Sequence, residues 1–204
     1  MIKNIIFDLG NVILKDYPNI VLDQVKIDKE QYESIKSNFF ADWKALDLGL
    51  STLKEQLEKC EFNFKIAPEV EELMLCYYKY RPFNDEVLEL IKLLKEKQYK
   101  LYILSNNNKE AEKYLTELPI FKNFDGWVFS CDYQLKKPDP KLYNILFETY
   151  NLKPEECFFI DDKQTNIEIG KKLGMNGFVL DYKNDGTDAL IKQLKIEKIL
   201  WKLF

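Results

Sequence analysis

Polar side chains lie at the ends of several apolar runs of this sequence, where they could do chemistry. Asp8 follows the first run, and a hydroxyl with three amides begins at Ser105 after a later one. Such a cluster at a strand end, before a helix, suits phosphate binding. Asp161 and Asp162 end another run, and two adjacent carboxylates at the end of a buried strand call for a cation. Lys137 precedes a proline, which keeps its backbone extended and aims its side chain away from the helix that follows.

Each of these features also has a structural explanation that needs no chemistry. An aspartate at a strand end, such as Asp8, is commonly a turn former or a helix cap. The polar residues from Ser105 onward suit an ordinary strand-to-helix turn, and most lysines are simply solvated. The order of the four features along the chain is therefore more informative than any one of them.

Composition narrows the chemistry further. The 204 residues contain no histidine, which excludes imidazole bases, Ser-His or Cys-His nucleophile pairs and His-ligated zinc. Carboxylates and lysines must therefore carry out any reaction. With 30 Lys plus Arg against 34 Asp plus Glu, the formal charge is -4, and no uniform positive field exists to hold nucleic acid or anionic lipid. We accordingly expect no nucleic acid partner and no membrane partner.

The four cysteines never form a Cys-x-x-Cys pair; they are Cys60, Cys76, Cys131 and Cys157. This spacing favours buried free thiols over a zinc knuckle or a redox site. The N-terminal apolar run meets Asp8 too early for a signal peptide, and no run approaches about 20 apolar residues. The sequence thus predicts a protein of a reducing compartment, the cytoplasm.

Continuous apolar runs alternate with helical periodicity, which is typical of strands buried on both faces of a parallel sheet. We place strands at Ile2 to Asp8, Lys100 to Ser105, Gly126 to Ser130, Cys157 to Asp161 and Gly177 to Leu180. Helical spacing predicts one helix up to Lys97 with Asn84 as its N-cap, and a second over Lys141 to Tyr150 capped by Asp139. With 46% hydrophobic residues to fill its core, the chain is predicted to be an α/β protein.

From about Asp16 to Arg81 only helical periodicity occurs, which predicts a helical subdomain inserted after the first strand. Its expected helices are Lys29 to Leu46, Thr52 to Cys60 and Pro68 to Tyr80. Thr52 and Glu55 have the spacing of a capping box, and the Asp47-Leu48-Gly49-Leu50 break separates the first two helices. The tail from Thr187 to Phe204 is also helical. We expect it to pack on its own core rather than on a second copy, and both a monomer and a homodimer stay open.

Taken in order, the four motifs resemble those of the haloacid dehalogenase (HAD) superfamily of aspartate-nucleophile hydrolases. They are an aspartate at the first strand, Ser-Asn at the second, Lys-Pro-Asp before a helix and Asp-Asp at a later strand. The inserted helices look like that family's small helical cap, so the resemblance covers nearly the whole chain. It implies a Rossmann-like parallel-sheet core at 1–15 and 82–204, with the cap at 16–81. The segment FDLGNVIL looks like the subgroup of bacterial sugar-phosphate phosphatases that act on glucose-1-phosphate.

The resemblance also implies roles for individual residues. Asp8 would attack phosphorus and form an aspartyl phosphate, which water then hydrolyses. Lys137 would neutralise both the phosphate and the charge of Asp8. The implied phosphate-binding residues are Ser105, Asn106 and Lys137, and the implied Mg²⁺ ligands are Asp8, Asp161, Asp162 and the backbone carbonyl of Gly10. The expected activity is magnesium-dependent hydrolysis of a small phosphorylated metabolite.

The chain departs from the family's commonest pattern at Gly10, where the usual pattern has a second aspartate that protonates the leaving group and later activates water. Glycine supplies no proton, and general acid-base catalysis contributes about 10² to 10⁴-fold, so poor leaving groups should suffer most. Asp16 is a nearby substitute. A good leaving group, such as the anomeric oxygen of a sugar 1-phosphate, is the other solution. Phosphomutase chemistry, which normally relies on the second aspartate, is disfavoured.

Two other functions stay open. A metal-independent 2-haloacid dehalogenase would leave the paired acids with little purpose, and Arg81 is the only arginine that could cradle a halide or a carboxylate. A noncatalytic relative that binds phosphate or protein is suggested by the missing acid.

Several aromatic residues of the insert either wall a substrate pocket or pack inside the cap, with packing favoured for most of them: Tyr17, Tyr32, Phe39, Phe40 and Trp43.

Overall fold

A single parallel sheet forms the centre of the molecule. The structure is a computed structural model that describes residues 1–15, 19–41, 43–181, 184 and 186–200. The strands are β1 (Asn4–Phe7), β2 (Lys100–Ser105), β3 (Gly126–Phe129), β4 (Cys157–Asp161) and β5 (Asn176–Val179). They pair in the order β3-β2-β1-β4-β5. The expected Rossmann-like α/β fold is confirmed, and no strand end differs by more than two residues from its expected position.

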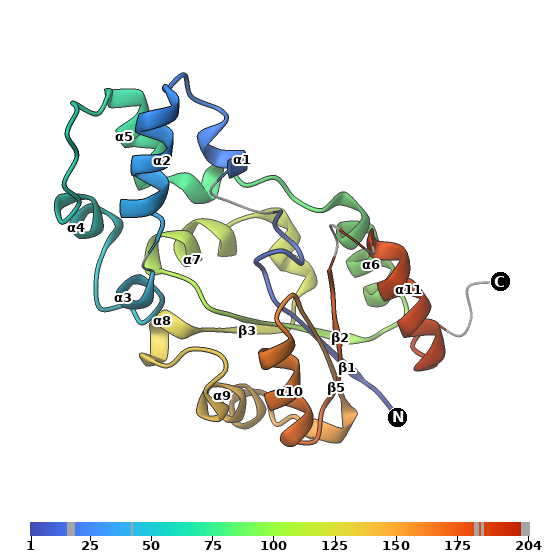
Figure 1. The fold of residues 1–204 in the computed structure, drawn as a ribbon. Coiled ribbons are helices and arrows are strands. Elements are labelled where there is room, and N and C mark those ends of the chain that lie inside the picture. Colours follow the sequence, from blue (N-terminus) through green and yellow to red (C-terminus); the bar gives the residue numbers. More distant parts are fainter. Residues whose placement is uncertain (16–18, 42, 182–183, 185, 201–204) are drawn as a thin grey trace.

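Helices cover both faces of this sheet because its strands are apolar at successive positions. One face packs on α6 (Asp85–Glu96), α7 (Lys109–Thr116) and α11 (Gly186–Ile196). The other face packs on α9 (Pro140–Tyr150) and α10 (Gln164–Lys172), as Figure 1 shows. Shorter elements are η2 (Pro119–Asn123), α8 (Ser130–Tyr133) and η3 (Pro154–Glu156).

The C-terminal tail packs on the core of its own chain, as expected. Leu190 and Leu194 of α11, together with Ile199 and Leu200, are buried in the hydrophobic cluster on the face of the sheet that α6 and α7 cover. The helix itself ends at Ile196, earlier than the helical spacing of the tail predicts, and residues 201–204 lie outside the described residues.

The register of the sheet brings the polar strand ends together. Phe7, the last residue of β1, pairs with Ile103 of β2 and with Ile160 of β4. Because all three strands are parallel, Asp8 follows at the same edge as Ser105 and Asp161.

A second helical unit lies beyond this edge (Figure 1). Its elements are α1 (Asn19–Leu22), α2 (Lys29–Asn38), α3 (Lys44–Asp47), α4 (Leu53–Glu58), α5 (Pro68–Leu75) and η1 (Tyr77–Lys79). They share a hydrophobic cluster of their own, separate from the two clusters that flank the sheet. We call this unit the cap. Its described residues contain no strand, as expected, while the exact boundaries 16 and 81 stay a prediction.

The expected helix from Lys29 to Leu46 is wrong, because α2 ends at Asn38 and α3 begins at Lys44. Helical spacing continues through the break, but aromatic packing turns the chain there. The ring of Phe39 packs edge-on against the rings of Phe40 and Trp43, with centroid distances of 5.0 and 5.9 Å.

The expected helix from Pro68 to Tyr80 is too long. The α-helix ends at Leu75, and the tighter turn η1 follows. The turn lets Tyr77 pack inside the cap while Tyr78 reaches Tyr114 of α7, at a centroid distance of 5.3 Å. This contact joins the cap to the core.

The helix caps follow the sequence with one exception. The capping box of Thr52 and Glu55 is confirmed, with both of its hydrogen bonds present. Asp139 caps α9 by accepting a hydrogen bond from the backbone N–H of Lys141. Asn84 occupies the N-cap position of α6, but its side chain makes no capping hydrogen bond.

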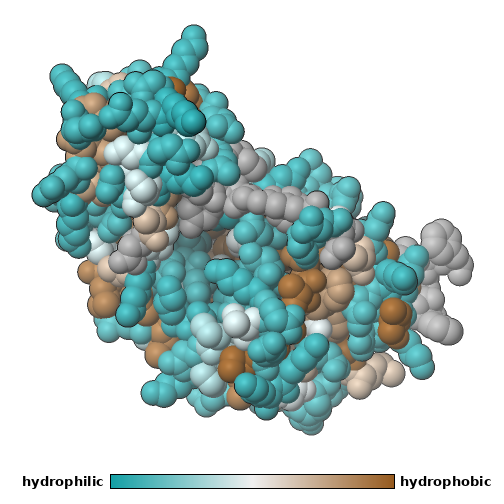
Figure 2. Space-filling view, in the orientation of Figure 1, coloured by the Kyte–Doolittle hydropathy of each residue, from teal (hydrophilic) through white to brown (hydrophobic). Residues whose placement is uncertain are grey.

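The surface is largely hydrophilic on the face shown in Figure 2, where apolar side chains are scattered rather than gathered in one broad patch. Within the described part of the chain, none of the helices has the length and apolar character needed to cross a bilayer.

Candidate active site

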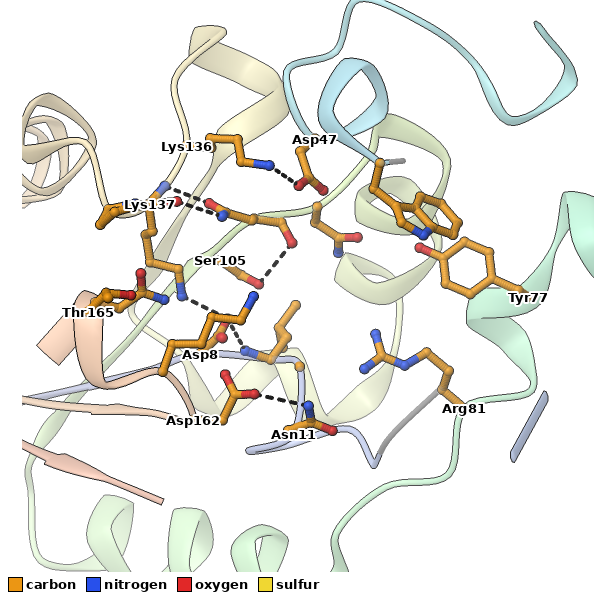
Figure 3. A pocket seen from close by; sticks show the side chains of 18 residues that line it. Asp8, Asn11, Asp47, Tyr77, Arg81, Ser105, Lys136, Lys137, Asp162 and Thr165 are labelled. Carbon is orange, nitrogen blue, oxygen red and sulfur yellow. Dashed lines mark hydrogen bonds and ion pairs between the residues drawn. The ribbon is translucent and has the colours of Figure 1, made fainter. Parts of the chain in front are cut away.

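Asp8 lies in a pocket of about 350 Å³ that is lined by both core and cap residues (Figure 3). Its backbone N–H donates to the carbonyl oxygen of Ile160 at 2.9 Å, which fixes the chain at the end of β1. Its Oδ1 accepts a hydrogen bond from the N–H of Leu9 at 2.7 Å and lies 3.0 Å from Nζ of Lys137. Only 7% of Asp8 is exposed, so these neighbours hold the carboxylate in one orientation.

Lys137 is buried between two carboxylates. Its Nζ lies 3.0 Å from Oδ1 of Asp8 and 2.6 Å from Oδ2 of Asp161. The side chain of Asn106 holds the lysine backbone by accepting from the N–H of Lys137 at 2.8 Å and donating to its carbonyl oxygen at 3.1 Å. Asn106 is therefore a clamp that positions the lysine.

The adjacent carboxylates Asp161 and Asp162 have different surroundings. Both oxygen atoms of Asp161 accept from Nδ2 of Asn166, at 2.8 and 3.0 Å, in addition to the contact with Lys137. Asp162 lines the pocket, and its Oδ2 accepts from Nδ2 of Asn11 at 3.0 Å. Asp161 thus orients the lysine from behind the pocket, while Asp162 faces it.

Asn11 completes the sharp exit from β1. Its φ of 56° is left-handed, a conformation that asparagine tolerates better than most residues. This turn directs its amide toward Asp162. Its Oδ1 is buried and finds no hydrogen-bond donor among the described residues.

Ser105 lies 2% exposed at the end of β2 and lines the same pocket. The next helix, α7, begins four residues later, with the side chain of Asn108 accepting from the N–H of Ala111 at 2.9 Å. A hydroxyl and a turn of backbone leading to a helix N-terminus are therefore available to an anion.

Burial raises the pKa of Asp8 to about 6, although Lys137 opposes the rise; the charges of Asp161 and Asp162 add to it. Burial likewise raises the pKa of the Asp162 carboxyl. Burial alone would lower the pKa of Lys137, but the charges of Asp161 and Asp8 outweigh it and raise that pKa. The three carboxylates lie close together and share the buried ammonium of Lys137, so a bound cation would relieve the repulsion between them.

The donor atoms fit a divalent metal. Carboxylate oxygens of Asp8, Asp161 and Asp162 all lie within 4.8 Å of one another. Oxygen donors suit hard cations such as Mg²⁺ rather than zinc sites of nitrogen and sulfur. Gly10 lines the pocket beside Asp8 and Asp162, so a backbone group is available there as well.

The cap supplies the opposite wall through Asp47 and Tyr77 (Figure 3), and Trp43 of the cap also lines the pocket. Oδ2 of Asp47 forms an ion pair with Nζ of Lys136 at 2.9 Å. The hydroxyl of Tyr77 accepts from Nδ2 of Asn108 at 2.9 Å. Both contacts join cap to core, so the cap is seated over the nucleophile.

The candidate residues chosen from the sequence meet at this site, although their roles stay predictions. Six of them line the pocket and one lies directly behind it: Asp8, Gly10, Ser105, Asn106, Lys137, Asp162 and then Asp161. Sequence reasoning missed Asn11 and Asn166. A signal for Asn166 existed, because a residue in the first turn of α10 lies close to the strand end that precedes the helix.

The aromatic residues of the cap divide between two roles. Phe39 and Phe40 are buried in the cap cluster and Tyr32 packs against it, as favoured, whereas Trp43 lines the pocket. Tyr77 also lines it and was not predicted. Asp16, the suggested substitute acid, and Tyr17 lie outside the described residues.

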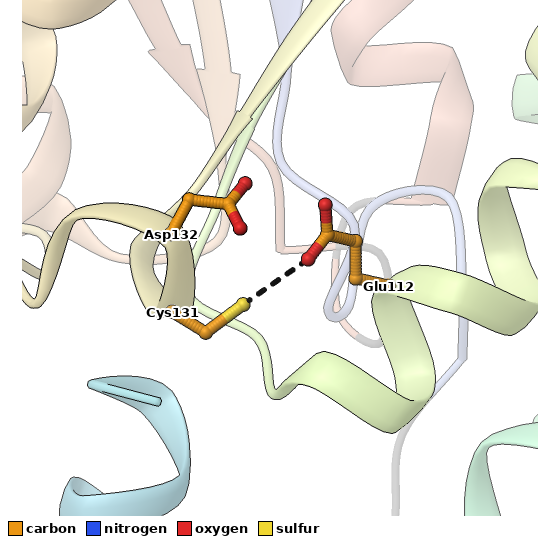
Figure 4. A group of neighbouring side chains, drawn as sticks. All are labelled: Glu112, Cys131 and Asp132. Carbon is orange, nitrogen blue, oxygen red and sulfur yellow. Dashed lines mark hydrogen bonds between the residues drawn. The ribbon is translucent and has the colours of Figure 1, made fainter. Parts of the chain in front are cut away.

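A second group of side chains of metal-binding type lies apart from the pocket lining and consists of Glu112, Cys131 and Asp132 (Figure 4). Lys109 already forms ion pairs with both carboxylates. Burial, together with the charges of Glu112 and Asp132, raises the pKa of the Cys131 thiol far above neutrality. The group is thus balanced by a lysine, and all four cysteines of the chain are free thiols, as expected.

Comparison with known proteins finds relatives of this chain. The sequence model of the haloacid dehalogenase-like hydrolase family matches residues 2–174. A phosphorylated carbohydrates phosphatase of Thermotoga maritima is 30% identical in an alignment of 161 positions that covers 74% of this chain and 74% of that protein. A D-ribitol-5-phosphate phosphatase of Bacteroides thetaiotaomicron is 28% identical over 195 residues, covering 87% and 91% of the two chains.

A solved structure has the same fold. It is a HAD family enzyme from Bacteroides thetaiotaomicron, crystallised in complex with magnesium and inorganic phosphate. The TM-score is 0.74 at 22% identity, and the match covers 93% of this chain and 99% of the other.

Proposed function

Because the chain belongs to the haloacid dehalogenase-like hydrolase family and is a phosphatase within it, we propose that it hydrolyses a small phosphorylated metabolite through an aspartyl phosphate on Asp8. One observation supports this above all. The Asp8 carboxylate lies 3.0 Å from the Lys137 ammonium in a pocket that Asp162 also faces. A nucleophile, a counter-charge for phosphate and a cation ligand are thus within reach of one bound group.

The residues of this chain divide the work as follows. Asp8 Oδ attacks phosphorus, and its short contacts with Leu9 and Lys137 hold it in place for that attack. Lys137 neutralises phosphate oxygens while Asp161 keeps its Nζ in position. The Ser105 hydroxyl and the backbone of Asn106 bind the remaining phosphoryl oxygens.

Mg²⁺ is the cation we propose, held by Asp8, Asp162 and the backbone carbonyl of Gly10. When bound, it would supply positive charge that reduces repulsion between an anionic nucleophile and an anionic substrate. Asp161, the fourth ligand expected from the sequence, belongs to the same group of carboxylates, but we propose that it acts behind the metal, because both of its oxygens already accept hydrogen bonds from Asn166.

We propose a phosphorylated sugar or sugar alcohol as the substrate class. Two relatives are named for phosphorylated carbohydrates and for D-ribitol-5-phosphate. The pocket, about 350 Å³, suits a small ligand, and the Trp43 and Tyr77 rings that line it suit the apolar face of a sugar. Action in the cytoplasm, as a monomer or homodimer and without nucleic acid, stays part of the proposal.

Dehalogenation is the weaker alternative. An aspartate that displaces halide needs no cation, and the carboxylate of Asp162, which faces the pocket beside Asp8, would then have no function. A noncatalytic binder would have no use for a buried lysine held against the nucleophile.

The test is phosphate release by the purified protein from p-nitrophenyl phosphate and from a panel of phosphorylated sugars and sugar alcohols. We expect turnover with Mg²⁺, loss after chelation, and recovery when Mg²⁺ is restored. Turnover that resists chelation would contradict the proposal. Halide release from a 2-haloacid, without phosphate release, would favour dehalogenation instead.

A further inference from the structure

Arg81 lies where the two segments that connect cap and core run side by side. The N–H of Lys15 donates to the carbonyl oxygen of Pro82 at 2.8 Å, and Leu14 forms an antiparallel bridge with Phe83. Nε and Nη2 of Arg81 lie 3.4 Å from the carbonyl oxygen of Lys15. The side chain is therefore anchored to these connecting segments, and its guanidinium reaches the pocket from them (Figure 3).

Gly10 faces this guanidinium. A Cβ built on Gly10 would lie 3.7 Å from Nη2 of Arg81, which is ordinary van der Waals contact. The φ of Gly10 is outside the left-handed region, so its backbone accepts a side chain. A carboxylate at position 10, two residues after the nucleophile, would therefore extend toward the guanidinium.

We propose that Arg81 stabilises the negative charge that develops on the leaving oxygen, in place of the acid missing at position 10. This inference rests on the proposed phosphatase function and makes it more specific. Arginine stays protonated in proteins, so it does not transfer a proton as a carboxylic acid does. Its N–H donors, aimed at an oxygen that gains charge in the transition state, lower the barrier electrostatically.

The reaction balances without a protein acid. The bond from Asp8 Oδ to phosphorus forms as the bond from phosphorus to the leaving oxygen breaks, and that electron pair stays on the leaving oxygen. Arg81 hydrogen-bonds the alkoxide until a water molecule protonates it. The hydroxide left by that water then attacks the aspartyl phosphate, which regenerates the Asp8 carboxylate and releases hydrogen phosphate.

A substrate preference follows. Charge stabilisation without protonation serves leaving oxygens that are only weakly basic, because these accept a negative charge at low cost. The anomeric oxygen of a sugar is such a group, and the oxygen of a simple primary alcohol is not. Within the proposed substrate class, sugar 1-phosphates should therefore be better substrates than phosphates of primary alcohols, which include the sugar-alcohol phosphates.

The experiment measures kcat/KM for p-nitrophenyl, phenyl and ethyl phosphates, whose leaving groups increase in basicity. Arg81→Met should lose about tenfold or less on the first ester and about 10² to 10³-fold on the last, since one lost oxyanion donor costs that much. Arg81→Lys keeps the positive charge, so its loss on each ester should be smaller than that of Arg81→Met but larger than zero. Lys79→Met is the matched control, because it removes an exposed positive charge two residues away that lies outside the pocket lining.

Gly10→Asp gives an independent arm. A carboxylate at position 10 would pair with the guanidinium and withdraw it from the leaving oxygen. We expect this variant to lose activity on ethyl phosphate more than on p-nitrophenyl phosphate. A selective gain on ethyl phosphate would overturn the proposal, because it would show that position 10 lacked only an acid.

A structural role for Arg81 predicts different results. An equal loss on all three esters by Arg81→Met, or a raised inhibition constant for inorganic phosphate, would mean that the substitution distorts the phosphate site, and would overturn the proposal. If kcat/KM depended on leaving-group basicity in both Arg81 variants as it does in the wild-type protein, the proposal would be overturned as well. These results differ from failure of the proposed function, in which the wild-type protein with Mg²⁺ hydrolyses none of the esters.

Discussion

The two ends of the pocket are built in different ways. At the phosphoryl end, formed by Asp8, Lys137 and Asp161, the side chains of the lysine and Asp161 are 1% and 0% exposed, and the ion pairs are made within the core. At the cap end, the pair of Lys136 and Asp47 joins core to cap with side chains 35% and 18% exposed. One end is therefore fixed by the sheet, while the other exists only when the cap is seated.

This difference separates turnover from substrate choice. Breaking a buried ion pair costs about 3 to 5 kcal/mol, because a charge is left uncompensated, whereas an exposed pair contributes about 0 to 1 kcal/mol. Changes at the phosphoryl end should therefore affect chemistry and stability for every substrate. Changes at the cap end should affect selectivity and leave the fold intact.

The largest effect is expected for Asp8→Asn. An amide is not an anionic nucleophile, so kcat should fall on the order of 10⁴-fold or more, comparable to loss of other catalytic nucleophiles. The fold should be retained, because asparagine has nearly the same shape. Steady-state kinetics and circular dichroism measure the two quantities, and a folded variant with substantial turnover would show that Asp8 is not the nucleophile.

Lys137→Met and Lys136→Met form a matched pair of neighbouring substitutions at the two ends. Lys137→Met leaves Asp8 and Asp161 without their shared counter-charge, so we expect a loss of about 3 to 5 kcal/mol in unfolding free energy and a large fall in kcat. Lys136→Met should cost about 1 kcal/mol or less and change KM more than kcat. Urea unfolding and kinetics on one substrate compare them, and equal effects would abolish the distinction between the ends.

Asp8 also imposes a pH dependence on the metal-free protein. Its pKa rises from 3.8 to about 6 on folding. Between these two pKa values the folded state therefore binds more protons than the unfolded state. The contribution of Asp8 to stability is present below about pH 4 and is lost as the pH rises through about 6. The loss amounts to about 3 kcal/mol when Asp8 is ionised.

Asp8→Asn isolates this contribution. Relative to the variant, the metal-free wild type should lose stability between about pH 4 and pH 8, and it should regain stability when Mg²⁺ is added at the higher pH. Thermal unfolding of both proteins across this range is the measurement. If the difference in stability between the two proteins stayed constant with pH, the pKa of Asp8 would not be raised on folding.

The same division explains what the sequence could predict. The strands were found because their apolar runs are continuous, and a parallel sheet then places Asp8, Ser105 and Asp161 at one edge. The predicted phosphoryl-end residues thus follow from local pattern and topology. The partners that hold them, such as Asn166, depend on side-chain geometry that spacing only suggests.

The cap end was less predictable for a physical reason. Asp47 and Tyr77 reach the pocket because of how the cap is seated on the core and where its helices end. Those helix ends are set by aromatic packing around Phe39 and Trp43, which helical periodicity does not record. Long-range packing therefore overrides local propensity in the cap more than in the sheet.

The smallest effect is expected for Asp47→Asn, which removes the charge of the cap-end pair but keeps its shape. The backbone carbonyl of Asp47 still accepts from the Ser130 hydroxyl, so the contact between cap and core should survive. Unfolding free energy should change by about 1 kcal/mol or less, and the change should shrink further in high salt. Because Lys136 loses its partner beside the pocket, KM for sugar phosphates should change several-fold, while kcat on p-nitrophenyl phosphate stays close to the wild-type value.

A loss of stability near that of Lys137→Met would show that the cap is as tightly coupled to the site as the sheet is. An equal fall in kcat for every substrate would instead place Asp47 in the chemistry, and the cap end would then no longer be a region of selectivity alone.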